Sequence, residues 1–253
     1  VTVNAVNDAP TANVASGQTN EDQSVVIALS GSDIDGDNLT FSLDSDATNG
    51  SVSLDGSLAT YTPDANFNGD DSFTFSVSDG EYSASASVAV SVAAVNDAPV
   101  LATVSDVSFD EDGSGSLSLS GSDVDGDDLE FSISGGTDIS ASLSGSDVSF
   151  SAPANYNGSE SFTASVTDGE YTDSQTITVT VNAVNDAPTA NVASGQTNED
   201  QSVVIALSGD DIDGDNLTFS LDSDATNGSV SLDGSLATYT PDANFNGDDS
   251  FTF

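Results

Sequence analysis

The sequence predicts an all-β protein built as a tandem array of β-sandwich domains, and three observations lead to that prediction. Apolar residues alternate with Ser and Thr over short runs, as at Leu39, Phe41 and Leu43, and this is the pattern of a half-buried strand. Asp-Gly, Asn-Gly and Pro separate the runs and favour turns. The pentapeptide Val-Asn-Asp-Ala-Pro begins at residues 6, 95 and 184, so the pattern recurs every 89 residues. That period exceeds the ~20–50 residues of solenoid repeats, so each repeat is a whole domain.

Within a repeat, the expected strands follow one another in a regular order. In the first repeat they include residues 39–43, 73–77 and 84–92, and in the second residues 177–181. About seven such strands per repeat fit an immunoglobulin-like sandwich. No window has a helical period or a helix cap.

The period also predicts the domain boundaries. Residues 1–6 correspond to the last strand of a preceding repeat, and the three repeats span residues 7–95, 96–184 and 185–253, the third lacking its final strands. Residues 179–253 match residues 1–75 except that Asp210 replaces Ser32. We interpret the chain as a window of a longer array. The alternative is that residues 1–6 of one chain fill the gap in the third domain of another.

The composition excludes several classes of function. The chain has 43 Asp and Glu but no Lys, Arg or His, so its formal charge is −43. Nucleic acid and anionic membrane surfaces are therefore poor partners. Without Cys, His or Lys, there is no disulfide, thiolate, imidazole or Schiff-base chemistry. No apolar run approaches the ~20 residues of a membrane helix.

The carboxylates gather at turns, where one motif stands out. Asp-x-Asp-Gly-Asp occurs at residues 33–37, 123–127 and 211–215. Alternating carboxylates with a Gly at the turn bring several oxygens around one point, which suits Ca²⁺ with its 6–8 oxygen ligands. The loop is not an EF-hand, since its Gly is fourth and no Glu stands at position twelve. Mg²⁺ fits less well because it retains its waters. A solvated acidic turn is the alternative interpretation.

Two further motifs accompany it. Asn20-Glu21-Asp22 precedes an early strand, and similar triplets stand at residues 110–112 and 198–200. The Val-Asn-Asp-Ala-Pro segment has Asn and Asp before Pro, which favours an extended connection with free side-chain oxygens. Taken singly, the triplet is an ordinary polar loop and the pentapeptide an ordinary turn.

Together, these motifs resemble the cadherin-like, Greek-key tandem repeats of large bacterial surface adhesins and extracellular repeat proteins. In cadherins, an early Glu, an Asp-x-Asp pair, an Asn-Asp-x-Ala-Pro linker and a later Asp share Ca²⁺ between consecutive domains. The matching positions here are Glu21, Asp33 with Asp35, the linker at residues 96–99, and Asp79. The bacterial signature at residues 63–69 is also present, with a middle copy at residues 153–158. The resemblance covers essentially the whole chain.

The resemblance implies a set of metal ligands at each linker. For the first complete junction it implies Glu21, Asp71, Asn96, Asp97, Asp123, Asp125 and Asp168; for the second it implies Glu111, Glu160, Asn185, Asp186, Asp211 and Asp213. The same positions in the flanking copies are Asn7, Asp8, Asp33, Asp35, Asp79 and Glu199. The Asp-Arg-Glu segment of cadherins is absent, and Ala154 replaces the acid found at Asp64. The number of ions per junction therefore stays open.

The function expected from these features is mechanical. The chain is an extender segment of a secreted or cell-surface adhesin or extracellular filament, made rigid by Ca²⁺ and contacting neighbouring repeats of the same long chain. A calcium-dependent adhesion module with homophilic or carbohydrate contacts is the alternative, and lateral or end-to-end assembly with other copies is a third possibility. An enzyme is not expected, because the acids recur in every copy whereas a catalytic site is normally singular.

Overall fold

The computed structural model describes residues 1–253, and its regular structure consists of β-strands alone. No helix in it is long and apolar enough to cross a membrane. By compactness the chain divides into two units. The first contains Val1–Ala102, Ser120–Glu130 and Ser165–Asp173, and the second contains Thr103–Leu119, Phe131–Ala164 and Ser174–Phe253.

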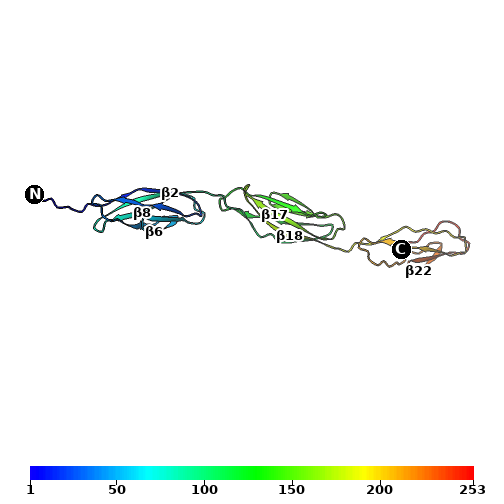
Figure 1. Cartoon of the computed structure of the whole chain (residues 1–253). Helices are drawn as coiled ribbons and strands as arrows, with labels where there is room; N and C mark the ends of the chain where they lie inside the picture. Colours follow the sequence, from blue (N-terminus) through cyan, green and yellow to red (C-terminus); the bar gives the residue numbers. More distant parts are fainter. The chain divides into compact units, whose positions relative to one another are not determined.

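The first repeat is built around a four-stranded sheet with the order β2-β9-β8-β5, of which Figure 1 labels β2 and β8. Its strands are β2 (Ala15–Asn20), β5 (Thr40–Ser45), β8 (Gly69–Ser78) and β9 (Ser83–Ala93). β8 and β9 form a long antiparallel hairpin, whereas β2 runs parallel to β9. The parallel pairing brings the end of β2 beside the end of β9, where the chain leaves the repeat.

A second layer faces this sheet. It has the order β3-β7-β6, formed by β3 (Val25–Ala28), β6 (Gly50–Asp55) and β7 (Leu58–Pro63). Two short strands, β1 (Thr11–Asn13) and β4 (Ser30–Ser32), pair separately. The chain thus changes partner between β1 and β2, which is why this repeat has nine strands where about seven were expected.

The core of the first repeat lies between the two layers. Phe73, Phe75 and Val77 on β8 are buried, as are Val88 and Val90 on β9. The residues between them are Ser, Thr and Ala, so the period-two alternation places one face of each strand inside. Each large apolar side chain buried in this way stabilises the fold by about 1.5–3 kcal/mol.

The second repeat has the same architecture. Its four-stranded sheet has the order β11-β18-β17-β14, from strands β11 (Val107–Asp110), β14 (Glu130–Gly135), β17 (Gly158–Thr167) and β18 (Thr172–Asn182). Its second layer is β12-β16-β15, from β12 (Ser114–Ser118), β15 (Ser140–Ser144) and β16 (Asp147–Ser151). The short pair is β10 (Val100–Leu101) with β13 (Gly121–Ser122). The predicted all-β fold of repeated sandwiches is therefore confirmed.

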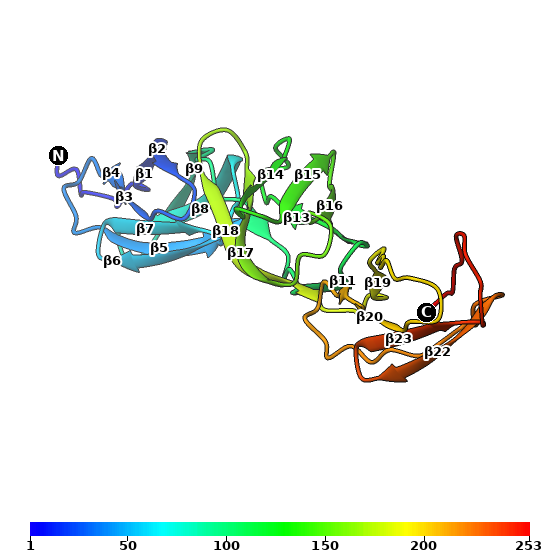
Figure 2. The same cartoon turned by 90° about the vertical axis from the view of Figure 1, so that its right-hand side faces the viewer.

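The third repeat retains only part of this architecture. A three-stranded layer β20-β23-β22 is present, from β20 (Val203–Ala206), β22 (Gly228–Asp233) and β23 (Leu236–Pro241) (Figure 2). The short pair is β19 (Thr189–Ala190) with β21 (Gly209–Asp210). No four-stranded sheet forms, and only an isolated bridge joins Ser223 to Thr252.

Candidate metal centre

Glu21 is a buried carboxylate at the end of β2. Its backbone N–H donates to the carbonyl oxygen of Ala93 at 2.9 Å, as the parallel pairing with β9 requires. Its side chain is 3% exposed, and its Oε1 accepts the N–H of Val95 at 2.5 Å. Its Oε2 is buried and has no hydrogen-bond partner. This carboxylate therefore anchors the linker with one oxygen and leaves the other unsatisfied.

The loop at residues 123–127 supplies a second set of carboxylates. Oδ1 of Asp123 accepts the backbone N–H groups of Asp125 at 2.9 Å and Gly126 at 3.1 Å. Gly126 has φ of 81°, a conformation that Gly adopts without steric cost. Oδ2 of Asp123 is buried and unpartnered. The turn thus fixes Asp123 while leaving the side chain of Asp125 free to reach the linker.

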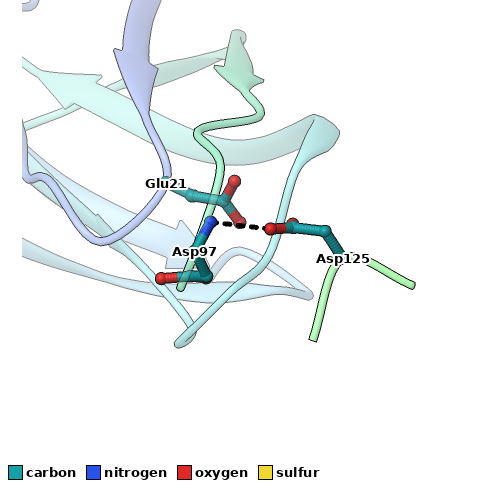
Figure 3. A group of neighbouring side chains, drawn as sticks. All are labelled: Glu21, Asp97 and Asp125. Carbon is teal, nitrogen blue, oxygen red and sulfur yellow. Dashed lines mark hydrogen bonds between the residues drawn. The ribbon is translucent and has the colours of Figure 1, made fainter. Parts of the chain in front are cut away.

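The linker residue Asp97 joins these two parts. Its N–H donates to Oδ2 of Asp125 at 2.7 Å, and Figure 3 shows this contact beside the Glu21 carboxylate. Carboxylate oxygens of Glu21, Asp97 and Asp125 all lie within 4.8 Å of one another, and so do those of Asp123, Asp125 and Asp127. We call these five residues the linker cluster. Oδ2 of Asp97 is a third buried oxygen without a partner.

Negative charge is concentrated in the linker cluster, and two of its members, Asp97 and Asp127, have a raised pKa. Burial raises the pKa of Asp97, and the charges of Asp125, Asp22, Glu21 and Asp123 raise it further. The pKa of Asp127 is raised by burial and by the charges of Asp123 and Asp125. Because the chain contains no Lys, Arg or His, no side chain of its own can neutralise the cluster.

Asp168 lies beside the linker, and its pKa is shifted in the opposite direction to that of Asp97. Burial alone would raise its pKa, but hydrogen bonds from Nδ2 of Asn96 and from the amides of Tyr171 and Glu170 lower it overall. The Asn96 contact measures 2.9 Å. Asp168 is therefore a stable anion that holds the linker amide in place.

The second linker repeats the backbone contacts of the first, but its carboxylates do not form a close group of three as those of the linker cluster do. Glu111 is 6% exposed and its Oε1 accepts the N–H of Val184 at 2.5 Å. The N–H of Asp186 donates to Asp213 at 2.6 Å, and Asp211 accepts the N–H of Asp213. Oδ2 of Asp186 is buried and unpartnered.

Burial raises the pKa of Asp186, and the charges of Asp213, Asp112, Glu111 and Asp211 raise it further. Nδ2 of Asn185 donates to the carbonyl oxygen of Asp186 at 2.9 Å.

The flanking copies form partial versions of this site. Nδ2 of Asn7 donates to Asp79 at 3.0 Å, the N–H of Asp8 donates to Asp35 at 2.8 Å, and Asp33, Asp35 and Asp37 group together. The pKa of Asp79 is lowered by the N–H groups of Tyr82 and Glu81, with the Asn7 amide adding to the effect. Glu199 is exposed, because the third repeat lacks the strand that buries Glu21 and Glu111.

Two of the expected ligands have other partners. Asp71 accepts the N–H groups of Thr48 and Asn49 and the hydroxyl of Tyr61. Glu160 accepts three N–H groups, from Thr137, Asp138 and Ile139. The structure groups neither with the linker carboxylates. Both hold a turn of their own repeat, so we leave them out of the ligand set proposed below.

The structure also brings together two residues that were left out of the expected ligand set. Asp37 and Asp127 group with the preceding two acids of their loops. Their position as the third acid of Asp-x-Asp-Gly-Asp was the available signal. An all-oxygen, anionic set of this kind is suited to a hard divalent cation and offers neither thiolate nor imidazole for a softer metal.

The comparisons with known proteins agree with this fold. The chain is a tandem array of immunoglobulin-like sandwiches, the class that its sheets define. It belongs to the bacterial Ig domain family, whose model matches residues 7–92, 96–180 and 185–253. Domains of this kind are typically not enzymes. No curated protein matches the sequence.

The chain is also similar, at low identity, to several solved structures. The chain PcdhgB3 EC1-4 is 14% identical, with a TM-score of 0.54 over 94% of this chain and 68% of that chain. Human Protocadherin-24 EC1-2 is 16% identical over 71% and 100% of the two chains, with a TM-score of 0.45. Endo-fucoidan hydrolase MfFcnA4, from glycoside hydrolase family 107, is 23% identical over 70% of this chain with a TM-score of 0.32. This chain spans only 29% of the hydrolase. The PcdhgB3 match supports the cadherin-like fold.

Proposed function

We propose that this chain is an extracellular extender segment whose linkers are made rigid by Ca²⁺. Family membership supports an extracellular repeat protein, since bacterial Ig and cadherin-like domains are typically found outside the cell. The observation that carries the metal proposal is the Oε2 of Glu21, a buried carboxylate oxygen without a partner. It belongs to a group of three carboxylates in a chain without a single basic side chain.

A buried unpaired carboxylate is costly, and only two partners can relieve that cost here. Its charge must be balanced by a proton or by a cation from solution. Neutral pH lies well above the ordinary pKa of Asp and Glu, near 4, which disfavours the proton. The cluster uses oxygen ligands only, and Ca²⁺ accepts many of them with flexible geometry.

The proposed ligands are the linker cluster at the first linker and its counterparts at the second. Glu21, Asp97, Asp123 and Asp125 supply oxygens from both repeats and from the linker between them. At the second linker, the counterparts are Glu111, Asp186, Asp211 and Asp213. A bound cation supplies positive charge that holds these anions together. Asn96 and Asp168 orient the linker from outside the group.

This arrangement would couple metal binding to stiffness and stability. A cation held by residues of two repeats and of their linker restrains the linker backbone. An ion that binds only the folded chain also stabilises it by mass action, by about 2.7 kcal/mol at a hundredfold excess over its dissociation constant. Length and rigidity, rather than recognition, are what near-identical repeats provide.

Calcium titration of paired variants tests the proposal. Asp123→Asn with Asp125→Asn should remove the heat of binding at the first linker and leave that of the second. The matched control, Asp55→Asn, removes a charge at the exposed β6–β7 turn and should leave both unchanged. Equal titration curves for the wild type and the double variant would show that the first linker binds no calcium.

A further inference from the structure

β15 is an edge strand of the second repeat, because it pairs with β16 on one side only (Figure 2). A two-residue hairpin joins the two strands, with Ser144 opposite Asp147, and such a turn closes on a hydrogen-bonded pair. In an antiparallel pair, alternate residues point their backbone N–H and C=O groups toward the neighbouring strand. The three serines of β15 therefore bond to β16, and the backbone groups of Ala141 and Leu143 point away from it.

The first and third repeats block the corresponding edge with a carboxylate. In the first repeat, Oδ1 of Asp46 accepts the outward N–H of Val52, an edge residue of β6, at 2.8 Å. In the third, Oδ1 of Asp224 accepts the N–H of Val230 on β22 at 2.8 Å. Exposed donors on an edge strand can pair with another chain, and natural proteins commonly protect such edges. We call this contact the edge cap.

The second repeat has no edge cap. Ala141 occupies the place of Val52 in the register of the layer, and no acceptor is found for its N–H. Where the capping acid stands in the other repeats, the second has Gly135-Gly136. A Cβ on Gly135 would lie 2.6 Å from a backbone oxygen, and one on Gly136 would clash with another. The turn is packed too closely to carry an acid, so the edge of β15 is open.

We propose that the open edge of β15 pairs antiparallel with the same edge of a second copy of this chain. A twofold axis at Ser142 relates the two strands. Each Ala141 then lies opposite Leu143 of the other copy, and the two residues exchange N–H···O=C bonds. Every backbone group that β15 points away from β16 finds a partner in this register. The two three-stranded layers join into one sheet, the mode of strand addition by which exposed edges bind extended segments.

The charge of the chain favours a second β15 as the occupant. The molecule carries −43, so two copies can approach closely only where acids are absent. β15 has the sequence Ser-Ala-Ser-Leu-Ser, whereas its counterpart β6 ends in Asp55. In the proposed register Ser140 lies opposite Ser144, and Ser142 lies opposite itself. Serine hydroxyls can bond across strands, as Ser142 and Ser149 do within the layer at 2.8 Å.

The symmetry of the contact limits the assembly that it can form. The same patch is used on both copies, so the contact closes on itself and gives dimers. A five-residue strand offers a small interface, below the ~1,200–2,000 Å² of stable complexes, so one contact should be weak. In a long array the edge would recur, and linked weak contacts reinforce one another. That side-by-side association rests on the extender function proposed above, whereas the edge contact itself does not.

Disulfide trapping in the full chain tests the register, because the chain has no Cys of its own. Ser142→Cys places a thiol of each copy at a non-hydrogen-bonded pair, where Cα atoms lie about 4.5 Å apart, within disulfide range. The reaction is run with diamide in chelator and high salt, so calcium plays no part and charge repulsion is screened. Covalent dimers should form roughly tenfold faster than for Ser53→Cys, the equivalent exposed position on the capped edge of β6. Ser140→Cys should also be slow, because its two copies lie about 13 Å apart in this register.

A charge pair tests the same register without a covalent bond. Ser140→Lys with Ser144→Asp leaves the net charge unchanged and places opposite charges face to face across the axis. Sedimentation velocity in chelator should then show a larger dimer fraction than the wild type. The matched control, Ser140→Lys with Ser142→Asp, has the same net charge but places two carboxylates opposite each other, and should show no gain.

Either measurement can overturn the proposal. Trapping of Ser142→Cys at the rate of Ser53→Cys would show that the two strands do not meet. A dimer fraction of the Ser140→Lys, Ser144→Asp variant that does not exceed that of its matched control would contradict the register. Because both measurements are made in chelator, their outcome is independent of whether the linkers bind calcium.

Discussion

Two repeats fix the same turn with different side chains. In the first repeat, the short carboxylate of Asp71 accepts two backbone amides across the turn and the hydroxyl of Tyr61. In the second, Phe150 replaces the tyrosine, and the longer Glu160 reaches a third backbone amide. The second repeat thus lacks the tyrosine hydroxyl as a hydrogen-bond donor, but its longer Glu160 side chain accepts one more backbone N–H in its place. These acids hold turns of their own repeats, whereas the resemblance to cadherins implied that they are metal ligands.

The Asp71 network predicts a pH dependence of stability. Burial would raise the pKa of Asp71, but the amides of Asn49, Ser72 and Thr48 and the Tyr61 hydroxyl lower it below its ordinary value of 3.8. The group therefore stabilises the fold above pH ~4, and that contribution is lost as the pH falls through the lowered pKa. Asp71→Asn should cost about 1–3 kcal/mol at neutral pH, and the cost should shrink toward pH ~2. Denaturant unfolding across this range measures it, with Asp55→Asn as the control. A cost independent of pH would contradict this account.

The charge of Asp97 is expected to have the opposite effect on the stability of the fold. Its pKa is raised by burial and by neighbouring carboxylates, so its negative charge destabilises the metal-free fold at neutral pH. Asp97→Asn should therefore raise the melting temperature in chelator. In calcium the same change removes a proposed ligand, and the melting temperature should fall below that of the wild type. Thermal unfolding under both conditions measures this reversal, and a shift of the same sign in both would contradict the assigned role.

The sequence was sufficient to identify the acids of the linkers but not to separate their tasks. The spacing of Asp123 and Asp125 places both in one turn, and Asn96-Asp97 marks the linker, so these positions could be read directly. Whether Asp71 faces that linker depends on which backbone amides fold back onto it. Those amides, at Thr48 and Asn49, come from a distant turn that local pattern does not position.

At the scale of elements, alternation predicted the strands because successive side chains in a strand point to opposite faces. Residues 84–92 were expected as one strand and form most of β9. The parallel pairing of β2 with β9 could not be predicted in this way. The direction of strand pairing is set by where the chain crosses between the layers. The alternation of apolar and polar residues within a strand does not indicate that direction.

β3 of the first repeat and β20 of the third have the same sequence, but only the first repeat contains β9. Comparing the two strands therefore tests what β9 contributes to the stability of its repeat. Ile27 is 5% exposed in the first repeat, whereas its counterpart Ile205 is partly exposed in the third, where no four-stranded sheet forms. Amides of β20 should exchange with solvent at least tenfold faster than those of β3, because stability varies with local burial. Hydrogen exchange followed by NMR measures this. Equal rates would show that β9 does not stabilise its repeat.

At the scale of the whole molecule, the charge of −43 is distributed in two ways. Part of it is concentrated at the linkers, where burial and neighbouring carboxylates raise the pKa of Asp97, Asp127 and Asp186. The rest is exposed and repels, so it favours separation between chains and between repeats. Calcium is proposed to act on the first part, and dissolved salt screens the second over a Debye length of ~8 Å at physiological ionic strength.

Small-angle scattering in calcium and in chelator, at equal ionic strength and low protein concentration, tests the central claim most directly. Salt screening is then the same in both samples, so any difference between the two scattering profiles comes from calcium binding at the linker sites. We expect the profile of stiffly joined repeats in calcium and that of flexibly joined repeats in chelator. Asp123→Asn with Asp125→Asn should reduce this difference. Profiles of the wild type that coincide with and without calcium would contradict the account.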